Sequence, residues 1–197
     1  MSKNVLFITV NLIKERTHLH ANVDDKVVLP FIKVAQDMYI EPVLGTPLFN
    51  KIIDLIDAGT IVTEGGGKYK TLMDRYIIDC MIWRTMQLLP VPLTMQFYNK
   101  GVKVKDGDND SSPSMSELAD ISNEYRTTAE HYENRLRRYL IKDNGKLYPE
   151  WEWAGDEEDD ILPRRTSYSS PVWLGDGFDR DPNIPVLYDP TKCNGCS

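Results

Sequence analysis

The stretch that decides the fold is NVDDKVVLPFIKVAQDMYIEPVLGTPLFNKI, residues 22–52. Its apolar residues recur at spacings of three and four, the repeat of one helix face. Asn22 is the expected N-cap, with Asp25 in the first turn. The repeat continues through Pro30, so we expect a kink there and not an end. The residues of this face are Val23, Val27, Phe31, Val34 and Met38.

A second helix follows the break at Gly45. Thr46 followed by Pro47 is typical of an N-cap with proline at the first helical position. The apolar pattern then runs to Ala58, and Gly59 is expected to close the helix.

Two further helices are expected. The segment Lys68–Leu89 is apolar almost all round, so this helix is either central in the fold or covered by a neighbouring subunit. Ser114 and Glu117 form a predicted capping box. It starts a long amphipathic helix whose apolar face is Leu118, Ile121, Tyr125, Tyr132, Leu136 and Tyr139. Its last turns carry basic residues, which favour the helix dipole; these are Arg135, Arg137, Arg138 and Lys142.

The apolar period changes from 3.6 to 2 in residues 94–105, which predicts a β-hairpin, with a polar loop over 106–113. The expected fold class is mainly α. A helical bundle over 1–148 carries this hairpin as an insertion, and a long extended C-terminal arm covers 149–197.

The predicted arm holds six of the 12 prolines and three of the four tryptophans, without a regular apolar period. A disordered tail is usually poor in aromatic residues. The arm either becomes ordered by burying its aromatic side chains on another surface, or wraps its own helical domain, and the residues leave both open. The aromatic residues concerned are Trp151, Trp153, Tyr168, Trp173, Phe178 and Tyr188.

The net charge of -7 comes from one local run. Seven acids and no base lie between Glu150 and Asp160, and the remaining 23 acids equal the 23 lysines and arginines. A duplex-binding domain needs a basic excess to release counterions, so tight DNA binding by a monomer is not expected. No apolar run approaches the ~18 residues of a membrane span, and no signal peptide is expected. We therefore expect a protein of the cytoplasm where it is made.

Two segments resemble ligand-binding loops. TEGGGKYKT contains Gly67–Lys68 but lacks the earlier glycine and the hydroxyl residue of a phosphate-binding loop, so a glycine turn is expected. Four acids have the spacing of a calcium loop, although Ser111 stands where glycine is needed. An acidic solvated loop is the default, with calcium as the alternative; these acids are Asp106, Asp108, Asp110 and Glu117.

The cysteine pair at the end of the chain offers half of a zinc site. Cys193 and Cys196 flank a turn, and no second cysteine pair exists. His18 and His20 of a neighbouring subunit are the candidates for the two missing zinc ligands. A free or redox-labile pair is the main expectation.

Nothing in the sequence supports catalysis. His131 is expected to be solvated on the polar face of the long helix, beside Glu130 and Glu133. No Ser-His-Asp set, apolar carboxylate pair or dinucleotide turn is visible. We expect no enzyme, no cofactor and no resident metal.

The segment 22–49 resembles the opening of small structural proteins of crAss-like and related phages of gut Bacteroidetes. The shared features are Ala-Gln-Asp and Pro-x-Leu-Gly-Thr, and the resemblance continues with YNKGV, TAEHYENRLRRYL, LYPEWEW and DILPRRTSYSSPVWLGD. It covers most of the chain in order. The acidic run and the ending KCNGCS match least.

The resemblance implies a head–tail connector, also called an adaptor or ring protein. Such subunits form a ring, expected to be dodecameric, below the portal, and join the capsid to the tail. The expected partners are other copies of the chain, the portal and the next ring or tail protein. Double-stranded DNA passes through the lumen without sequence-specific binding. No membrane is involved, and the location is the virion.

Within this hypothesis the hairpin contacts a neighbour, the portal or the DNA channel through Asn99, Lys100, Lys103 and Lys105, and the aromatic arm clamps the next component. The alternative is a small regulatory module that binds calcium at 106–117, zinc at the terminal cysteines, or another ligand.

Overall fold

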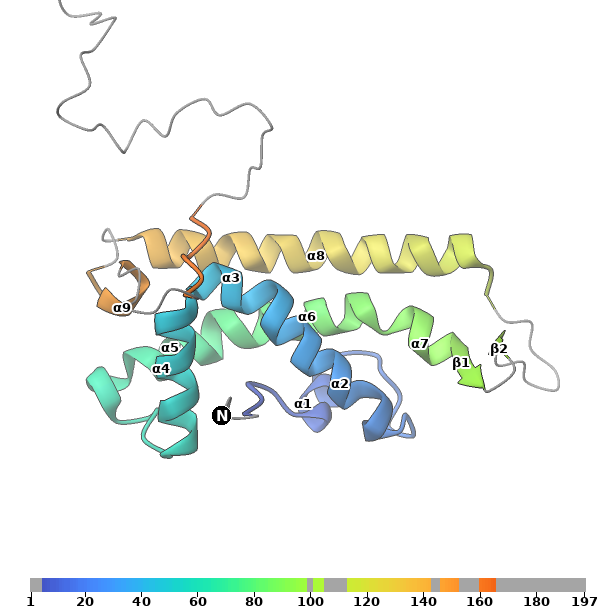
Figure 1. Cartoon of the computed structure of the whole chain (residues 1–197), viewed down its shortest axis with the longest axis horizontal. Coiled ribbons are helices and arrows are strands. Elements are labelled where there is room, and N and C mark those ends of the chain that lie inside the picture. The colour runs from blue at the N-terminus through green and yellow to red at the C-terminus, as the bar shows by residue number, and fades with distance from the viewer. Residues whose placement is uncertain (1–4, 99–100, 105–112, 143–145, 153–159, 166–197) are drawn as a thin grey trace, which may run out of the picture. The chain divides into compact units, whose positions relative to one another are not determined.

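The computed structural model describes residues 5–98, 101–104, 113–142, 146–152 and 160–165. In this part of the chain the fold is mainly α-helical, as the sequence predicted (Figure 1). The chain divides into a compact unit, Met1–Ser167, and a second unit, Tyr168–Ser197, which lies outside the described residues.

The N-terminal segment packs into the core and leads into α1 (Val10–Arg16), a helix that the sequence analysis missed. The Thr9 hydroxyl accepts a hydrogen bond from the backbone N–H of Leu12 at 3.3 Å and caps this helix. Phe7 is buried, and its N–H donates to Oε1 of Gln36 at 3.0 Å. The Gln36 amide also donates to the carbonyl of Val5, so one buried side chain holds this segment from both sides.

The first predicted helix is continuous through α2 (Asp25–Ala35), a π-helical turn (Gln36–Ile40) and α3 (Glu41–Leu44). It passes through Pro30 without ending, as predicted. The predicted N-cap Asn22 is wrong, because Asp24 caps the helix and accepts from Lys26 N–H at 2.9 Å.

Lys14 explains this shift of the helix start. Its ammonium group donates to the carbonyls of Ala21 at 3.0 Å and Val23 at 2.7 Å. These bonds hold residues 21–23 outside the helical conformation.

The second helix, α4 (Thr46–Asp57), follows Gly45, which has φ +75°. Gly45 stands at the N-cap position, so the predicted N-cap, Thr46, is one residue late. The Thr46 hydroxyl instead donates to the Glu41 carboxylate and accepts from the N–H of Ile161. Ala58 ends the helix and Gly59, with φ +69°, follows, as expected.

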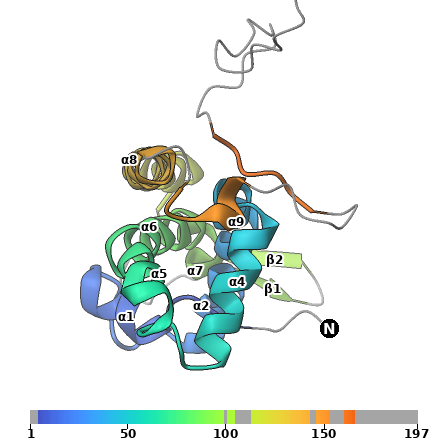
Figure 2. The same cartoon turned by 90° about the vertical axis from the view of Figure 1, so that its left-hand side faces the viewer.

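The third helix follows a 3₁₀ turn (Glu64–Gly67) and runs through α5 (Lys68–Leu72), a π-helical turn (Met73–Ile77) and α6 (Ile78–Leu88). Its predicted extent is confirmed to within one residue. Its side chains Leu72, Ile77 and Met81 are fully buried. α6 packs against both α2 and α8, so it is central in this unit (Figure 2).

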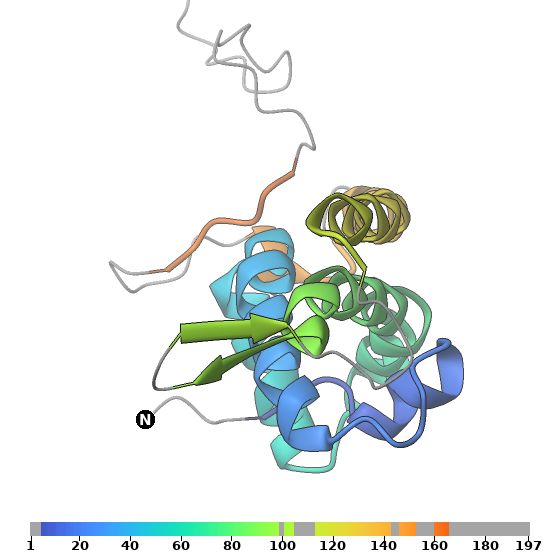
Figure 3. The same ribbon diagram turned by 90° about the vertical axis from the view of Figure 1, so that its right-hand side faces the viewer.

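The next elements are α7 (Pro90–Thr94), β1 (Met95–Tyr98) and β2 (Gly101–Val104). The two strands pair antiparallel, with Met95 opposite Val104 and Tyr98 opposite Gly101 (Figure 3).

The long helix α8 (Met115–Ile141) begins at the predicted capping box of Ser114 and Glu117. It lies along α6 and α7 and is followed by the short α9 (Pro149–Glu152). None of the helices in the described residues is long and apolar enough to cross a membrane.

A buried ion network joins α6 to α8. Arg84 donates through Nε and Nη2 to Oε2 of Glu133, and the Nε bond measures 3.1 Å. Arg137 donates to the other oxygen of the same carboxylate. All three residues are less than 9 % exposed. Glu133 is therefore not on the solvated face with His131, and Arg137 serves this network and not only the helix dipole.

Removing the shared carboxylate tests this network. Glu133→Leu leaves two buried guanidinium groups without their acceptor, so we expect the free energy of unfolding to fall by about 3–5 kcal/mol in urea denaturation. Glu130→Leu is the matched control, because Glu130 pairs with Arg126 on the exposed face of the same helix. That variant should lose at most about 1 kcal/mol. Equal losses in the two variants would contradict the assignment.

Candidate functional site

The corner between α3 and α4, which we define as residues 42–46, binds a segment from far along the chain. We call this segment, Asp160–Arg165, the strap. The N–H of Thr46 donates to the Ile161 carbonyl at 3.0 Å, and the Ile161 N–H donates to the Thr46 hydroxyl at 2.9 Å. The Arg164 N–H donates to the Pro42 carbonyl at 2.6 Å. The strap thus runs antiparallel to residues 42–46, and it lies beside α3 in Figure 1.

Gly45 allows the strap to approach the backbone closely. A Cβ at this position would lie 2.9 Å from Cδ of Pro163 and 3.2 Å from the carbonyl oxygen of Ile161. The φ of +75° with ψ of 150° is also a conformation that only glycine adopts readily. Two independent constraints, space and conformation, therefore require glycine at this position.

Trp151 closes the other side of the corner. It is 2 % exposed, and its indole N–H donates to the carbonyl of Val43 at 3.0 Å. The guanidinium of Arg165 lies 5.1 Å from its ring centre, a cation–π contact between the strap and α9. For Trp151 the structure therefore favours an arm that wraps its own helical domain. This side chain is buried against its own unit and is not available to a partner.

The residue before α9 strengthens this attachment. The Tyr148 hydroxyl donates to the carbonyl of Lys68 at 2.9 Å, and Tyr148 is 1 % exposed. Tyr69 donates to the Glu150 carboxylate at 2.8 Å. Hydrogen bonds to α3, α4 and α5 thus hold the two described ends of this region, residues 148–152 and the strap.

The strap leaves apolar side chains on the surface. Ile161 is 43 % exposed and Leu162 is 62 % exposed. Met38 and Val34, on the helix whose end holds the strap, are also exposed. Exposed apolar side chains of this kind are typical of a contact surface.

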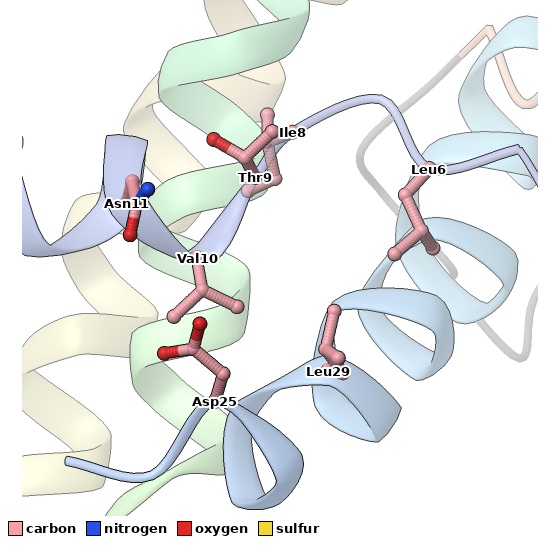
Figure 4. A pocket seen from close by; sticks show the side chains of 7 residues that line it. All are labelled: Leu6, Ile8, Thr9, Val10, Asn11, Asp25 and Leu29. Carbon is pink, nitrogen blue, oxygen red and sulfur yellow. The ribbon is translucent and has the colours of Figure 1, made fainter.

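A pocket of about 280 Å³ lies between the N-terminal segment and α2 (Figure 4). Asp25 binds Lys14 at 2.7 Å, and Thr9 caps α1, so these polar groups are already engaged locally. Leu29 at the rim is 42 % exposed. The pocket suits an apolar side chain better than a polar ligand; it is lined by Leu6, Ile8, Thr9, Val10, Asn11, Asp25 and Leu29.

Cys80 is a buried thiol beside the ion network. Burial raises its thiol pKa to about 12, and the Glu133 charge adds to this effect. A thiol is nucleophilic only as the thiolate, so Cys80 is a core residue and not a reactive one.

The candidate metal ligands that the structure describes are engaged elsewhere. Glu117 accepts from the Ser114 N–H at 2.7 Å, and this bond holds the pKa of its carboxyl below its ordinary value. His18 is hydrogen-bonded to the Tyr125 hydroxyl, and the His20 Nδ1 accepts from a backbone N–H at 3.1 Å. Among the described residues, no group of three or more His, Cys, Asp or Glu side chains could hold a metal ion.

Lys103 is the one other predicted site residue among the described residues. Lys103 lies in β2, opposite Gln96. Outside the described residues are Asn99, Lys100, Lys105, Asp106, Asp108, Asp110, Trp153, Tyr168, Trp173, Phe178, Tyr188, Cys193 and Cys196.

The chain matches the model of a known protein family. Residues 40–160 match the model described as "Family of unknown function (DUF6712)". The chain belongs to this family. The matched region begins in the last residue of the first π-helical turn and ends at the first residue of the strap. No curated protein and no solved structure matches the chain.

Two substitutions can separate the close approach of the strap to Gly45 from the backbone strain that any side chain causes at a positive φ. We expect Gly45→Ala to loosen the strap and to speed tryptic cleavage after Arg164 and Arg165, because the new Cβ would contact Pro163. Gly59→Ala is the control, since Gly59 also has a positive φ but no atom of the described residues lies within 4 Å of its added Cβ. That variant should lose only about 1–2 kcal/mol of stability and keep its cleavage rate. Unchanged cleavage in Gly45→Ala would contradict the close fit.

The raised pKa of Cys80 predicts its labelling. In a Cys193→Ser/Cys196→Ser background, iodoacetamide should modify Cys80 slowly at pH 8 and quickly in denaturant, because burial disfavours the thiolate. Rapid labelling of the folded protein would show that this part of the core opens readily.

Proposed function

We propose that this protein is a head–tail connector, a subunit of a ring below the portal of a tailed phage. The observation that carries the proposal is the corner. Three of the segments on which the resemblance depends, Pro42–Thr46, Tyr148–Trp151 and the strap, contact one another there. They hold the chain at Arg165, the point from which the aromatic segment continues in the sequence.

Exposed apolar side chains on different elements support assembly into a ring. Leu29 and Val34 are exposed on α2 and Met38 on the π-helical turn. Val91 is exposed on α7, and Met115 and Ile121 in the first half of α8. A ring needs two different surfaces on each subunit that bind head to tail.

The finer assignments belong to this proposal. The hairpin around 94–105, with Asn99, Lys100, Lys103 and Lys105, contacts a neighbour, the portal or the DNA channel. The extended arm clamps the next ring or tail protein through Trp153, Tyr168, Trp173, Phe178 and Tyr188, with Trp151 now removed from this set. The ring encloses the DNA without reading its sequence, and the subunit performs no catalysis.

The mass of the full-length protein in solution tests the proposal. Light scattering should detect a protein that joins the portal ring of its own virion as a closed ring. The variant Trp173→Ser/Phe178→Ser/Tyr188→Ser should keep the unfolding transition of the helical unit and still join the portal, but fail to bind the next component, because the clamp has lost its apolar anchors.

Two outcomes would contradict the proposal. A protein that stays monomeric with every virion component is not a connector. A stoichiometric metal ion in protein purified without chelators would favour the regulatory alternative.

A further inference from the structure

The strap is held by hydrogen bonds more than by burial. Three of these bonds join Ile161 and Arg164 to the corner, while the side chains of Ile161 and Leu162 are 43 % and 62 % exposed. Releasing the strap therefore exposes little more of these two side chains. The corner, with its glycine, would keep the same donors and acceptors for any chain that presents the strap sequence.

The link between Trp151 and Ile161, residues 152–160, is longer than the separation of its two ends requires. Trp151 binds Val43, and Ile161 binds Thr46, so both ends of the link meet at one corner. The nine residues between them could span roughly 30 Å when extended.

The composition of the link disfavours this return to one corner. Six of its nine residues are acidic, and like charges in a short loop repel one another and favour extension. The acidic residues are Glu152, Asp156, Glu157, Glu158, Asp159 and Asp160.

We propose that in the assembled protein the strap of one copy binds the corner of the next copy. This inference rests on the proposed ring, since it makes a second copy of the chain the partner. Exchange keeps the three hydrogen bonds, the fit at Gly45 and the contact of Arg165 with a tryptophan, and it separates the acidic residues. It also gives the acidic run a role, because repulsion within the run favours an extended link over a return to the corner of the same chain.

A crosslinking experiment on the full chain tests the exchange. In the Cys193→Ser/Cys196→Ser background, one population carries Thr46→Cys and the other Ile161→Cys, and a short bis-maleimide is added to the assembled mixture. Exchange places the two thiols side by side in different copies. In the control pair, Val62→Cys, at an exposed position outside the corner, replaces Thr46→Cys. The yield of covalent heterodimer from the test pair should be about ten-fold higher than the yield from this control pair.

The acidic link provides a second readout. The variant Asp156→Asn/Glu157→Gln/Glu158→Gln/Asp159→Asn removes the repulsion, so the yield of heterodimer should fall, and high salt should lower it in the original sequence too. In one chain that carries both Thr46→Cys and Ile161→Cys, exchange gives a ladder of linked copies. A monomer linked only to itself, at every protein concentration, would overturn the inference.

The failures of the two proposals differ. Closed rings in which the double variant links only within a chain would leave the connector proposal standing and refute the exchange. Linked copies that never close on a portal would support the exchange and refute the connector.

Discussion

The shared carboxylate of Glu133 fixes α8 on α6, and much of the remaining fold depends on that register. The buried guanidinium of Arg84 on α6 is satisfied only where Glu133 on α8 reaches it, so the long helix has one favourable position along α6. Its position determines where residues 148–151 return to the core. The corner is therefore closed by a helix whose placement is set by electrostatics as well as by apolar packing.

The helices were predictable because apolar spacing is a local signal that tertiary contacts rarely overturn in long segments. The errors lie where a distant residue decides a local conformation. Lys14 binds the carbonyls near the start of α2 and moves its cap from Asn22 to Asp24. Glu133 lies beside His131 in the sequence, and only the position of Arg84 on another helix distinguishes a buried carboxylate from a solvated one.

The candidate site was predictable in its parts but not in its assembly. The break between two helices at Gly45 was predicted, yet nothing local shows that Gly45 also leaves room for Pro163, which lies more than a hundred residues later. The aromatic content of the C-terminal region indicated burial on some surface. Only the contact between Trp151 and Val43 shows that this side chain is used within its own unit.

The separation between the corner and the strap also sets an order of events during synthesis. Thr46 and Ile161 are 115 residues apart, and ribosomes add about 5–20 residues per second. A nascent chain therefore has its corner for roughly 6 to 23 s before its own strap is made. On a polysome, where neighbouring chains are at different stages, each corner is available to a completed copy before its own strap has been translated.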